Sequence, residues 1–220
     1  MSDAFSVLII GPDPSEALEL ATQLEATGDF NAQWVSDTPR FARPFDAERI
    51  DTILALPGVG VAQLNATLAA GYRGLLIGLG MEMPVVSETI ALPVKMSNLI
   101  ARLKQQIRHF YARDDAWLTI GPFRLYPGSR KLVASDGTEQ RLTDKEVDIL
   151  RFMHRSGSAL VSRDQLLSGV WGYNDRVTTH TLETHIYRLR QKIEADPNAA
   201  TILITESGGY RLNEPPMETA

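Results

Sequence analysis

The sequence predicts two domains of different classes, a doubly wound α/β domain followed by an α+β domain. Apolar runs of strand length alternate with amphipathic segments of helix length as far as residue 112. Short strands separated by turns, then three helices and a hairpin, fill the rest of the chain. Alternating helices and continuous apolar strands are typical of a mostly parallel sheet covered on both faces. With 220 residues the chain is long enough for two ordinary domains.

Breaker residues mark the ends of the strands in the first half. Phe5–Ile10 is an unbroken apolar run that ends at Gly11 and Pro12, and Ile53–Leu56 ends at Pro57-Gly58. The other expected elements are the helix Ser15–Ala26, the strand Ala32–Val35, the helix Val61–Ala70, the strands Gly74–Leu79 and Ile90–Leu92, and a helix from about Ser97 to Tyr111. We assign the first domain to residues 1–112.

The second half begins after a charged link that we assign to residues 113–116, and the second domain is expected over 117–213. Its short strands are expected at Trp117–Ile120, Arg124–Tyr126 and Lys131–Ala134, between Gly-Pro, Pro-Gly and Asp-Gly turns. Residues 214–220 contain two prolines and are expected to form a loose tail.

Three helices and a hairpin complete the expected second domain. Thr143 to Glu146 and Ser162 to Gln165 match the capping-box pattern, in which two side chains satisfy the free backbone donors of a helix start. A third helix is expected over Thr179–Ala195. The last element is a hairpin from Ile202–Thr205 to Tyr210–Leu212, with its turn at Ser207-Gly208-Gly209.

Charge and composition leave DNA binding open but exclude some other classes. The net charge is −5, with 8 basic and 12 acidic side chains in residues 1–112 and 14 and 15 in residues 113–220. A nearly neutral domain can still bind phosphates when its cations share one face. The absence of Cys excludes disulfides and thiolate metal sites. Because no secretory signal or membrane-spanning run is recognisable, a cytoplasmic protein without membrane contact is expected.

The third helix of the second half has one apolar and one cationic side. Leu182, Ile186, Leu189 and Ile193 form an expected buried stripe at helical spacing. The other side presents Thr184, Tyr187, Arg188 and Gln191, flanked by His185, Arg190 and Lys192. Such a helix can enter the DNA major groove, where arginine can bind guanine with two hydrogen bonds. An ordinary solvated face on a core helix is an equally good interpretation of this helix taken alone.

From Leu142 onward the sequence resembles the effector domain of OmpR/PhoB-type response regulators. The resembling stretches are LTDKEVDILRFM, LVSRDQLLSGVWGY, HTLETHIYRLRQKIEADP and ITESGGYRL, in family order and at family spacing. The resemblance implies a winged helix-turn-helix domain whose third helix enters the major groove and whose hairpin wing reaches the minor groove. It therefore implies a sequence-specific transcription regulator that binds double-stranded promoter DNA.

The resemblance also assigns individual positions to DNA contact. These are His180, Thr181, Thr184, His185, Tyr187, Arg188, Arg190, Lys192, Thr205 and Arg211. His180 and Ser207 stand where the family usually has arginine, which weakens phosphate anchoring, and Arg211 could partly substitute. The loop Trp171-Gly172-Tyr173 can touch RNA polymerase in relatives, although Trp171 itself is expected to fill the core.

The first half resembles the flavodoxin-like receiver domain of the same family, but without its phosphorylation chemistry. Ordinary receivers need a Mg²⁺-binding acid pair, a nucleophilic Asp, a Thr or Ser, and a Lys. The residues at these places are Gly11 and Pro12, Leu56 (or Ala55 if the register slips), Leu79, and Leu92. Because leucine cannot accept a phosphoryl group and Gly-Pro offers no carboxylate, we predict a degenerate receiver, independent of phosphorylation and of a histidine kinase.

Several alternatives remain open at this point. Phosphorylation could fall on Asp13 or on Asp51, although Asp51 begins its strand at the wrong edge of the sheet. The glycines near the strand ends, with Pro12, could leave an apolar pocket for a neutral metabolite; they are Gly11, Gly58, Gly78 and Gly80. A protein partner could control the domain instead. The DNA contacts could also be vestigial and the protein an interaction module.

The segment between Gly80 and Pro93 is too short for the usual fourth helix of a receiver, which is expected to be truncated or unwound. Since that helix forms part of the dimer face in relatives, we expect a homodimer that is constitutive or uses another face.

No grouping of residues predicts an enzyme. A Ser-His-Asp grouping, a phosphate-binding glycine loop and paired buried carboxylates are not recognisable. His180 and His185 are five residues apart without a third ligand in register, which argues against zinc. No metal or cofactor is therefore expected.

Overall fold

The computed structural model describes residues 4–37, 47–157, 159–172 and 179–213. Contacts divide the chain into two compact units, an N-terminal unit of residues 4–110 and a C-terminal unit from residue 111. Each unit is described by itself. The expected tail at 214–220 and Tyr173 of the expected polymerase loop lie outside the described residues.

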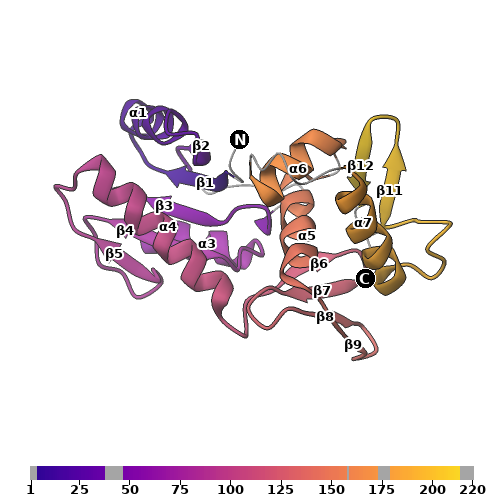
Figure 1. Ribbon diagram of the computed structural model, residues 1–220. Helices are drawn as coiled ribbons and strands as arrows, with labels where there is room; N and C mark the ends of the chain where they lie inside the picture. The colour runs from indigo at the N-terminus through magenta and orange to yellow at the C-terminus, as the bar shows by residue number, and fades with distance from the viewer. Residues whose placement is uncertain (1–3, 38–46, 158, 173–178, 214–220) are drawn as a thin grey trace. The chain divides into compact units, whose positions relative to one another are not determined.

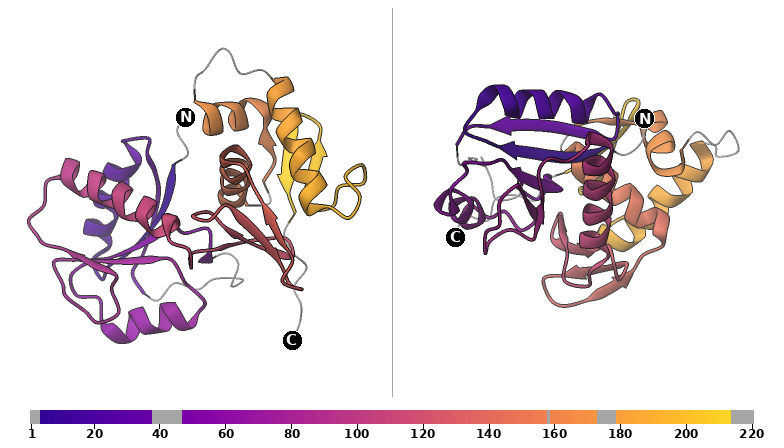
Figure 2. Two further views of the ribbon diagram at one scale, coloured as in Figure 1. Left: turned by 60° about the horizontal axis from the view of Figure 1, so that its bottom comes forward. Right: turned by 90° about the vertical axis from the view of Figure 1, so that its left-hand side faces the viewer.

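The N-terminal unit is built on a parallel five-stranded sheet with strand order β2-β1-β3-β4-β5. This is the flavodoxin-like order, and it confirms the predicted doubly wound α/β class. Figure 2 shows α1 and α4 on one face of the sheet and α3 on the other. The elements are β1 (Phe5–Ile10), α1 (Pro14–Glu25), β2 (Phe30–Val35), β3 (Thr52–Ala55), α3 (Val61–Ala69), β4 (Leu75–Leu79), β5 (Glu88–Ile90) and α4 (Met96–Ala112).

The central strands of this sheet are buried along their length. Every residue of β3 and β4 is buried, because helices cover both faces. Leu24 of α1 and Leu103 of α4 are both 0 % exposed and pack into the core. Asp13 begins α1 by accepting a hydrogen bond from the Ser15 backbone N–H at 2.8 Å, which satisfies one of the free donors of the helix start.

The connection from β4 to β5 contains no helix. Residues 80–87 run from Gly80, which has φ +64°, to Ser87, whose N–H donates to the Leu76 carbonyl at 2.7 Å. The prediction of a truncated or unwound fourth helix is therefore confirmed. Beyond this connection, an ion pair between Glu88 and Arg102 joins β5 to α4.

In its described residues the C-terminal unit combines two antiparallel sheets with three helices, as predicted for a winged-helix domain (Figure 1). One sheet has the order β6-β7-β8-β9 and the other β10-β12-β11. The elements are β6 (Leu118–Ile120), β7 (Phe123–Tyr126), β8 (Lys131–Ala134), β9 (Glu139–Arg141), α5 (Asp144–Ser156), β10 (Val161–Ser162), α6 (Arg163–Trp171), α7 (Thr179–Ile193), β11 (Leu203–Glu206) and β12 (Gly209–Leu212).

Both predicted capping boxes are present. Thr143 and Glu146 exchange side-chain and backbone hydrogen bonds at the start of α5, and Ser162 and Gln165 do so at the start of α6. Strands β9 and β10 were not predicted, because the sequence EQR has no apolar alternation and β10 has only two residues.

The final hairpin turns over two residues rather than the predicted three. Glu206 pairs with Gly209, so that Ser207 and Gly208 form the turn. Gly208 has φ +95°, a conformation that glycine adopts without the steric cost that a Cβ atom brings.

Candidate nucleic-acid interface

Helix α7 is amphipathic in the way the sequence predicts. Its buried stripe consists of Leu182, Ile186, Leu189 and Ile193, each at most 3 % exposed. The stripe holds α7 against α5 and α6. On the other side of α7, Tyr187 is 55 % exposed and Arg188 and Gln191 are also exposed. This side of the helix is thus available to an external ligand.

The residues assigned to DNA contact on α7 differ in accessibility. His180, Tyr187 and Arg188 are exposed, whereas Thr181, Thr184 and His185 are half-buried. Within the described part of the chain, Arg188 has no ion-pair partner, so its guanidinium retains its donors for an external acceptor. Arg188 is therefore the cation of α7 that is best placed to bind a base or a phosphate.

Arg190 is bound to the neighbouring hairpin. Its Nε and Nη2 donate to the Leu203 carbonyl at 3.0 and 2.7 Å, and Nη2 also donates to Thr205 Oγ1 at 2.7 Å. Arg190 and Thr205, both assigned to DNA contact from the sequence, are thus each other's partners in the free protein.

Lys192 of α7 binds Glu146, a buried residue of α5, and the backbone of Arg141. Its Nζ contacts Glu146 Oε2 at 2.8 Å and the Arg141 carbonyl at 2.9 Å. Glu146 is only 1 % exposed, while a quarter of the Lys192 side chain is exposed. Burial by itself would raise the pKa of the Glu146 carboxyl. The hydrogen bonds from Lys192 and the Thr143 backbone, with the charge of Lys192, outweigh burial and hold this pKa below its ordinary value.

His185 packs against Trp171 at the end of α6. Their ring centroids lie 5.5 Å apart, and Lys145 Nζ lies 5.4 Å from the centre of the Trp171 ring. Burial is the main cause that lowers the pKa of His185; Glu146 opposes it, and the cations Arg188 and Lys145 add to it. The surroundings of His185 therefore favour the neutral form of its imidazole over the charged form.

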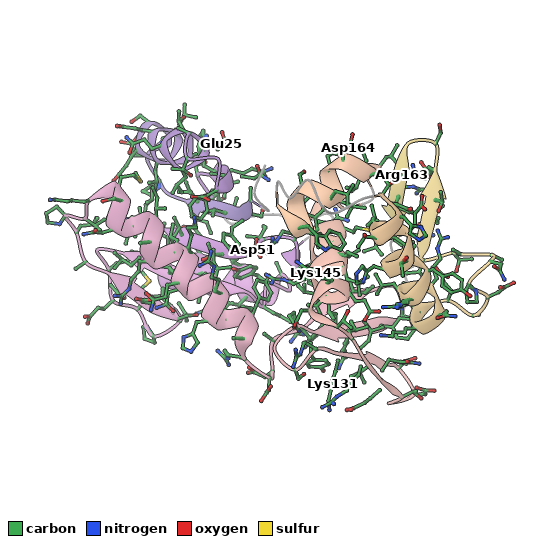
Figure 3. All side chains as sticks on the ribbon, in the orientation of Figure 1. Glu25, Asp51, Lys131, Lys145, Arg163 and Asp164 are labelled. Carbon is green, nitrogen blue, oxygen red and sulfur yellow. The ribbon has the colours of Figure 1, made fainter. Side chains whose placement is uncertain are left out.

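The hairpin β11–β12 lies beside α7 (Figure 1). Its turn residues Ser207 and Gly208 are exposed. Arg211 pairs with Glu206 across the hairpin, with an Nε to Oε1 distance of 2.7 Å, so its charge is partly offset. Near the turn of the hairpin, the guanidinium of Arg163, labelled in Figure 3, lies 5.2 Å from the centre of the Tyr210 ring.

The strand ends of the N-terminal unit are filled by apolar side chains. Leu56 follows β3 and is 2 % exposed. A Cβ atom on Gly11 would lie 2.7 Å from Leu56 Cδ1, one on Gly58 would lie 3.0 Å from Pro12 Cγ, and one on Gly80 would lie 3.0 Å from Leu92 Cδ1. Leu79, which ends β4, is buried at 3 % exposure.

The expectation of an apolar pocket at these glycines is therefore corrected. The space left by the missing side chains is occupied by neighbouring residues of the same unit, including Met81, whose carbonyl would lie 2.7 Å from a Cβ on Gly78.

The two aspartates considered as alternative phosphorylation sites both have structural roles. Asp13 caps α1 and accepts from Ser15 Oγ at 2.6 Å, and the hydrogen bonds from Ser15 lower its pKa. Asp51, labelled in Figure 3, immediately precedes β3 and is 1 % exposed. Its Oδ2 accepts from the Ser6 backbone N–H at 2.8 Å. Asp51 therefore lies at the amino end of its strand, away from the carboxyl edge where Leu56 lies.

Known proteins resemble both halves of the chain. The family described as Transcriptional regulatory protein, C terminal, matches residues 137–212. The sensory transduction protein RegX3 of Mycobacterium tuberculosis (strain ATCC 25618 / H37Rv) is 32 % identical over 225 residues, which cover 94 % of this chain and 98 % of RegX3. The chain belongs to the OmpR/PhoB family of response regulators. It is a DNA-binding response regulator with a parallel α/β N-terminal domain and a winged-helix C-terminal domain.

Two further proteins align with most of this chain. The DNA-binding response regulator MtrA of Mycolicibacterium smegmatis is 27 % identical, covering 95 % of this chain and 97 % of MtrA. The structure of DrrB, a Thermotoga maritima OmpR/PhoB homologue, aligns with a TM-score of 0.43 and 17 % identity over 95 % of this chain and 99 % of DrrB. Among the described residues of this regulator, no helix is both long and apolar enough to cross a membrane.

Proposed function

We propose that this response regulator recognises promoter DNA with the exposed side of α7 and with the hairpin β11–β12. The observation that carries the proposal is the exposed guanidinium of Arg188, which lies opposite a fully buried stripe and has no ion-pair partner among the described residues. In the major groove, arginine binds guanine O6 and N7 with two hydrogen bonds. Tyr187 beside it adds an apolar surface and a hydroxyl.

We assign the remaining residues predicted for DNA contact to three roles. The first role is direct DNA contact. It falls to the first half of α7, at His180, Thr181 and Thr184, and to the hairpin, at Thr205 and Arg211. Arg190 and Lys192 support the interface from within the protein, because their donors are bound to Leu203, Thr205, Glu146 and Arg141. His185 positions α7 against Trp171.

Replacing Arg188 with alanine is expected to remove about 1–3 kcal/mol of sequence preference while leaving most non-specific affinity. The reason is that a bidentate base contact discriminates between bases, whereas phosphate contacts do not. Binding is measured by mobility shift with a duplex that the full chain selects from a random library, and with a scrambled duplex of the same composition.

Two further measurements complete this test. Glu139→Gln is the matched control, because Glu139 lies on β9 in an exposed ion pair with Lys131. Affinity of the parent chain should fall steeply as salt rises, as phosphate binding requires. If the parent shows no preference for any selected duplex, the proposal gives way to the interaction-module alternative.

We propose further that DNA binding by this regulator is independent of phosphorylation. In support, Leu56 is buried where a nucleophile would be needed, and Gly11 and Pro12 supply no carboxylate for Mg²⁺. Leu79 and Leu92 supply neither a hydroxyl nor an ammonium group. Asp13 and Asp51 are engaged as a helix cap and as a buried acceptor. Control then comes from abundance, or from a protein partner or ligand bound by the N-terminal unit, rather than from a histidine kinase.

Incubation with acetyl phosphate and Mg²⁺ is expected to leave both the mass of the protein and its DNA affinity unchanged. The measurements are intact-protein mass spectrometry and a mobility shift with the selected duplex. Equilibrium sedimentation under the same conditions tests the associated proposal of a constitutive homodimer. A gain of one phosphoryl group, or a dimer that depends on the donor, would contradict phosphorylation independence.

A contact with RNA polymerase through the loop after α6 also remains a proposal. Trp171, the last residue of α6, is half-buried against His185 and Lys145, whereas Gly172 after it is exposed.

A further inference from the structure

Glu194, the residue directly after α7, binds the start of the wing strand β11. Its Oε2 accepts from the Thr201 backbone N–H at 2.8 Å and from Thr201 Oγ1 at 3.1 Å. Its Oε1 accepts from the backbone N–H groups of Ile202 at 2.9 Å and Leu203 at 2.7 Å. One carboxylate therefore holds three consecutive backbone donors. Hydrogen bonds to an ionised acceptor are about twice as strong as those between neutral groups.

Arg190 completes this attachment one turn earlier on the same helix. The Leu203 carbonyl accepts from Arg190 Nε and Nη2, while the Leu203 N–H donates to Glu194. Both backbone polar groups of Leu203 are thus satisfied by side chains of α7 and of the residue directly after it. Thr205, farther along β11, is held by the same guanidinium.

These contacts lie on the free edge of the sheet. In the order β10-β12-β11, strand β11 pairs with β12 on one side only. An edge strand ordinarily leaves unpaired N–H and C=O groups on its other side. Here the charged side chains of Arg190 and Glu194, at the end of α7, bind the polar groups that a further strand would otherwise bind. The helix and the strand are consequently joined by directional bonds as well as by apolar packing.

We infer that Glu194 and Arg190 are positioning residues that fix the wing relative to α7, so that the two meet DNA as one rigid unit. The DNA part of this inference rests on the proposed function. The physical argument is that two separate DNA-contacting elements bind more tightly when their relative position is set before binding. Nine residues separate Ile193 from β11, and without these bonds the hairpin would be attached to α7 largely through packing of its apolar side.

The first test measures the geometry of the free protein. Because the chain has no Cys, spin labels can be placed uniquely by Glu183→Cys on α7 and Ser207→Cys at the hairpin turn, both at exposed positions. Pulsed dipolar spectroscopy of the full chain should give one narrow distance distribution. Glu194→Gln, which turns an amide NH₂ toward backbone donors, should broaden it, and Arg190→Lys, which lacks the planar fork, should do the same.

The second test measures DNA affinity with the selected duplex. Glu194→Gln should bind about tenfold more weakly, which corresponds to losing roughly one good contact. The bases it prefers should remain those of the parent, because the residues of α7 that contact bases are intact. Glu139→Gln is the control that removes one exposed carboxylate of the same unit and should change neither the distances nor the affinity.

Each outcome bears on one of the two proposals. An unchanged distance distribution in both Glu194→Gln and Arg190→Lys would overturn the positioning role, as would a broadened distribution with undiminished affinity. If Glu194→Gln does not fold, Arg190→Lys alone decides the question. If the parent selects no duplex, the proposed function fails, whereas the distance measurement still shows whether the two residues hold the wing.

Discussion

Replacing Lys192 with methionine is expected to lower the free energy of unfolding of the C-terminal unit by about 3 kcal/mol, because removing one partner of a buried ion pair leaves the other charge uncompensated. Glu146 is 1 % exposed and would keep only its bonds to the Thr143 cap. The estimate is at the lower end for buried pairs, since Lys192 itself is partly exposed. Urea unfolding followed by tryptophan fluorescence in a Trp34→Phe background reports this unit through Trp117 and Trp171.

An exposed pair provides the matched comparison. Lys131 and Glu139 lie 2.7 Å apart, but both side chains are more than a third exposed, so Lys131→Met should cost no more than about 0.5 kcal/mol. Adding Glu146→Gln to Lys192→Met should recover part of the lost stability, because the buried charge is then absent. Equal effects of Lys192→Met and Lys131→Met would show that the buried pair contributes no more than a surface one.

The ion pair between Lys192 and Glu146 also determines how the free energy of unfolding of this unit changes as the pH falls. The pKa of Glu146 is lower in the folded protein than its ordinary value, so the unfolded chain takes up the proton first as the pH falls. The pair therefore contributes its full stability above the ordinary pKa of a glutamate carboxyl and loses it as the pH falls through the lower folded pKa. Glu146→Gln should remove this part of the acid dependence.

Replacing Gly209 with alanine is expected to lower the free energy of unfolding of the same unit by about 3 kcal/mol, the upper part of the range for inserting a group into a filled space. A Cβ atom there would lie 2.1 Å from the Val161 carbonyl oxygen and 2.8 Å from its carbon. Both are backbone atoms of β10, which pairs with β12 at Ser162 and Gly209. The two strands must separate, which displaces the end of the wing hairpin next to its turn. Urea unfolding measures the loss, and affinity for the selected duplex should fall with it.

A substitution at the neighbouring Gly208 distinguishes the cost of crowding by an added Cβ atom from the cost of an unfavourable backbone conformation. A Cβ on Gly208 would meet no atom within 4 Å, but the residue has φ +95°. Gly208→Ala should therefore cost only about 1–2 kcal/mol of backbone strain. If Gly209→Ala lowers the free energy of unfolding no more than Gly208→Ala does, then β10 moves away from β12 at a smaller cost than its contacts indicate.

Local patterns sufficed to predict most of the secondary structure. The capping residues Thr143 and Ser162 marked two helix starts, and the stripe from Leu182 to Ile193 defined the buried side of α7, because both signals depend on residues only three to four positions apart. Strand β9 was not predicted, because its sequence EQR has no apolar alternation. It is held to β8 by backbone hydrogen bonds, which the sequence pattern does not reveal.

The sequence by itself determined the two fold classes, the buried stripe of α7 and the shortened connection between β4 and β5, because periodicity, caps and spacing are local properties of the chain. It also predicted which residues could contact DNA, but it could not show which of Arg188, Arg190 and Lys192 are already bound by other residues of the chain. The tertiary structure distinguished them: Arg188 is exposed, Arg190 is bound to β11, and Lys192 is paired with a buried carboxylate from α5. It likewise filled the expected pocket at Gly11 with Leu56. The partners in question are up to 46 residues apart in sequence, and only the packing of elements against each other decides which distant side chains meet.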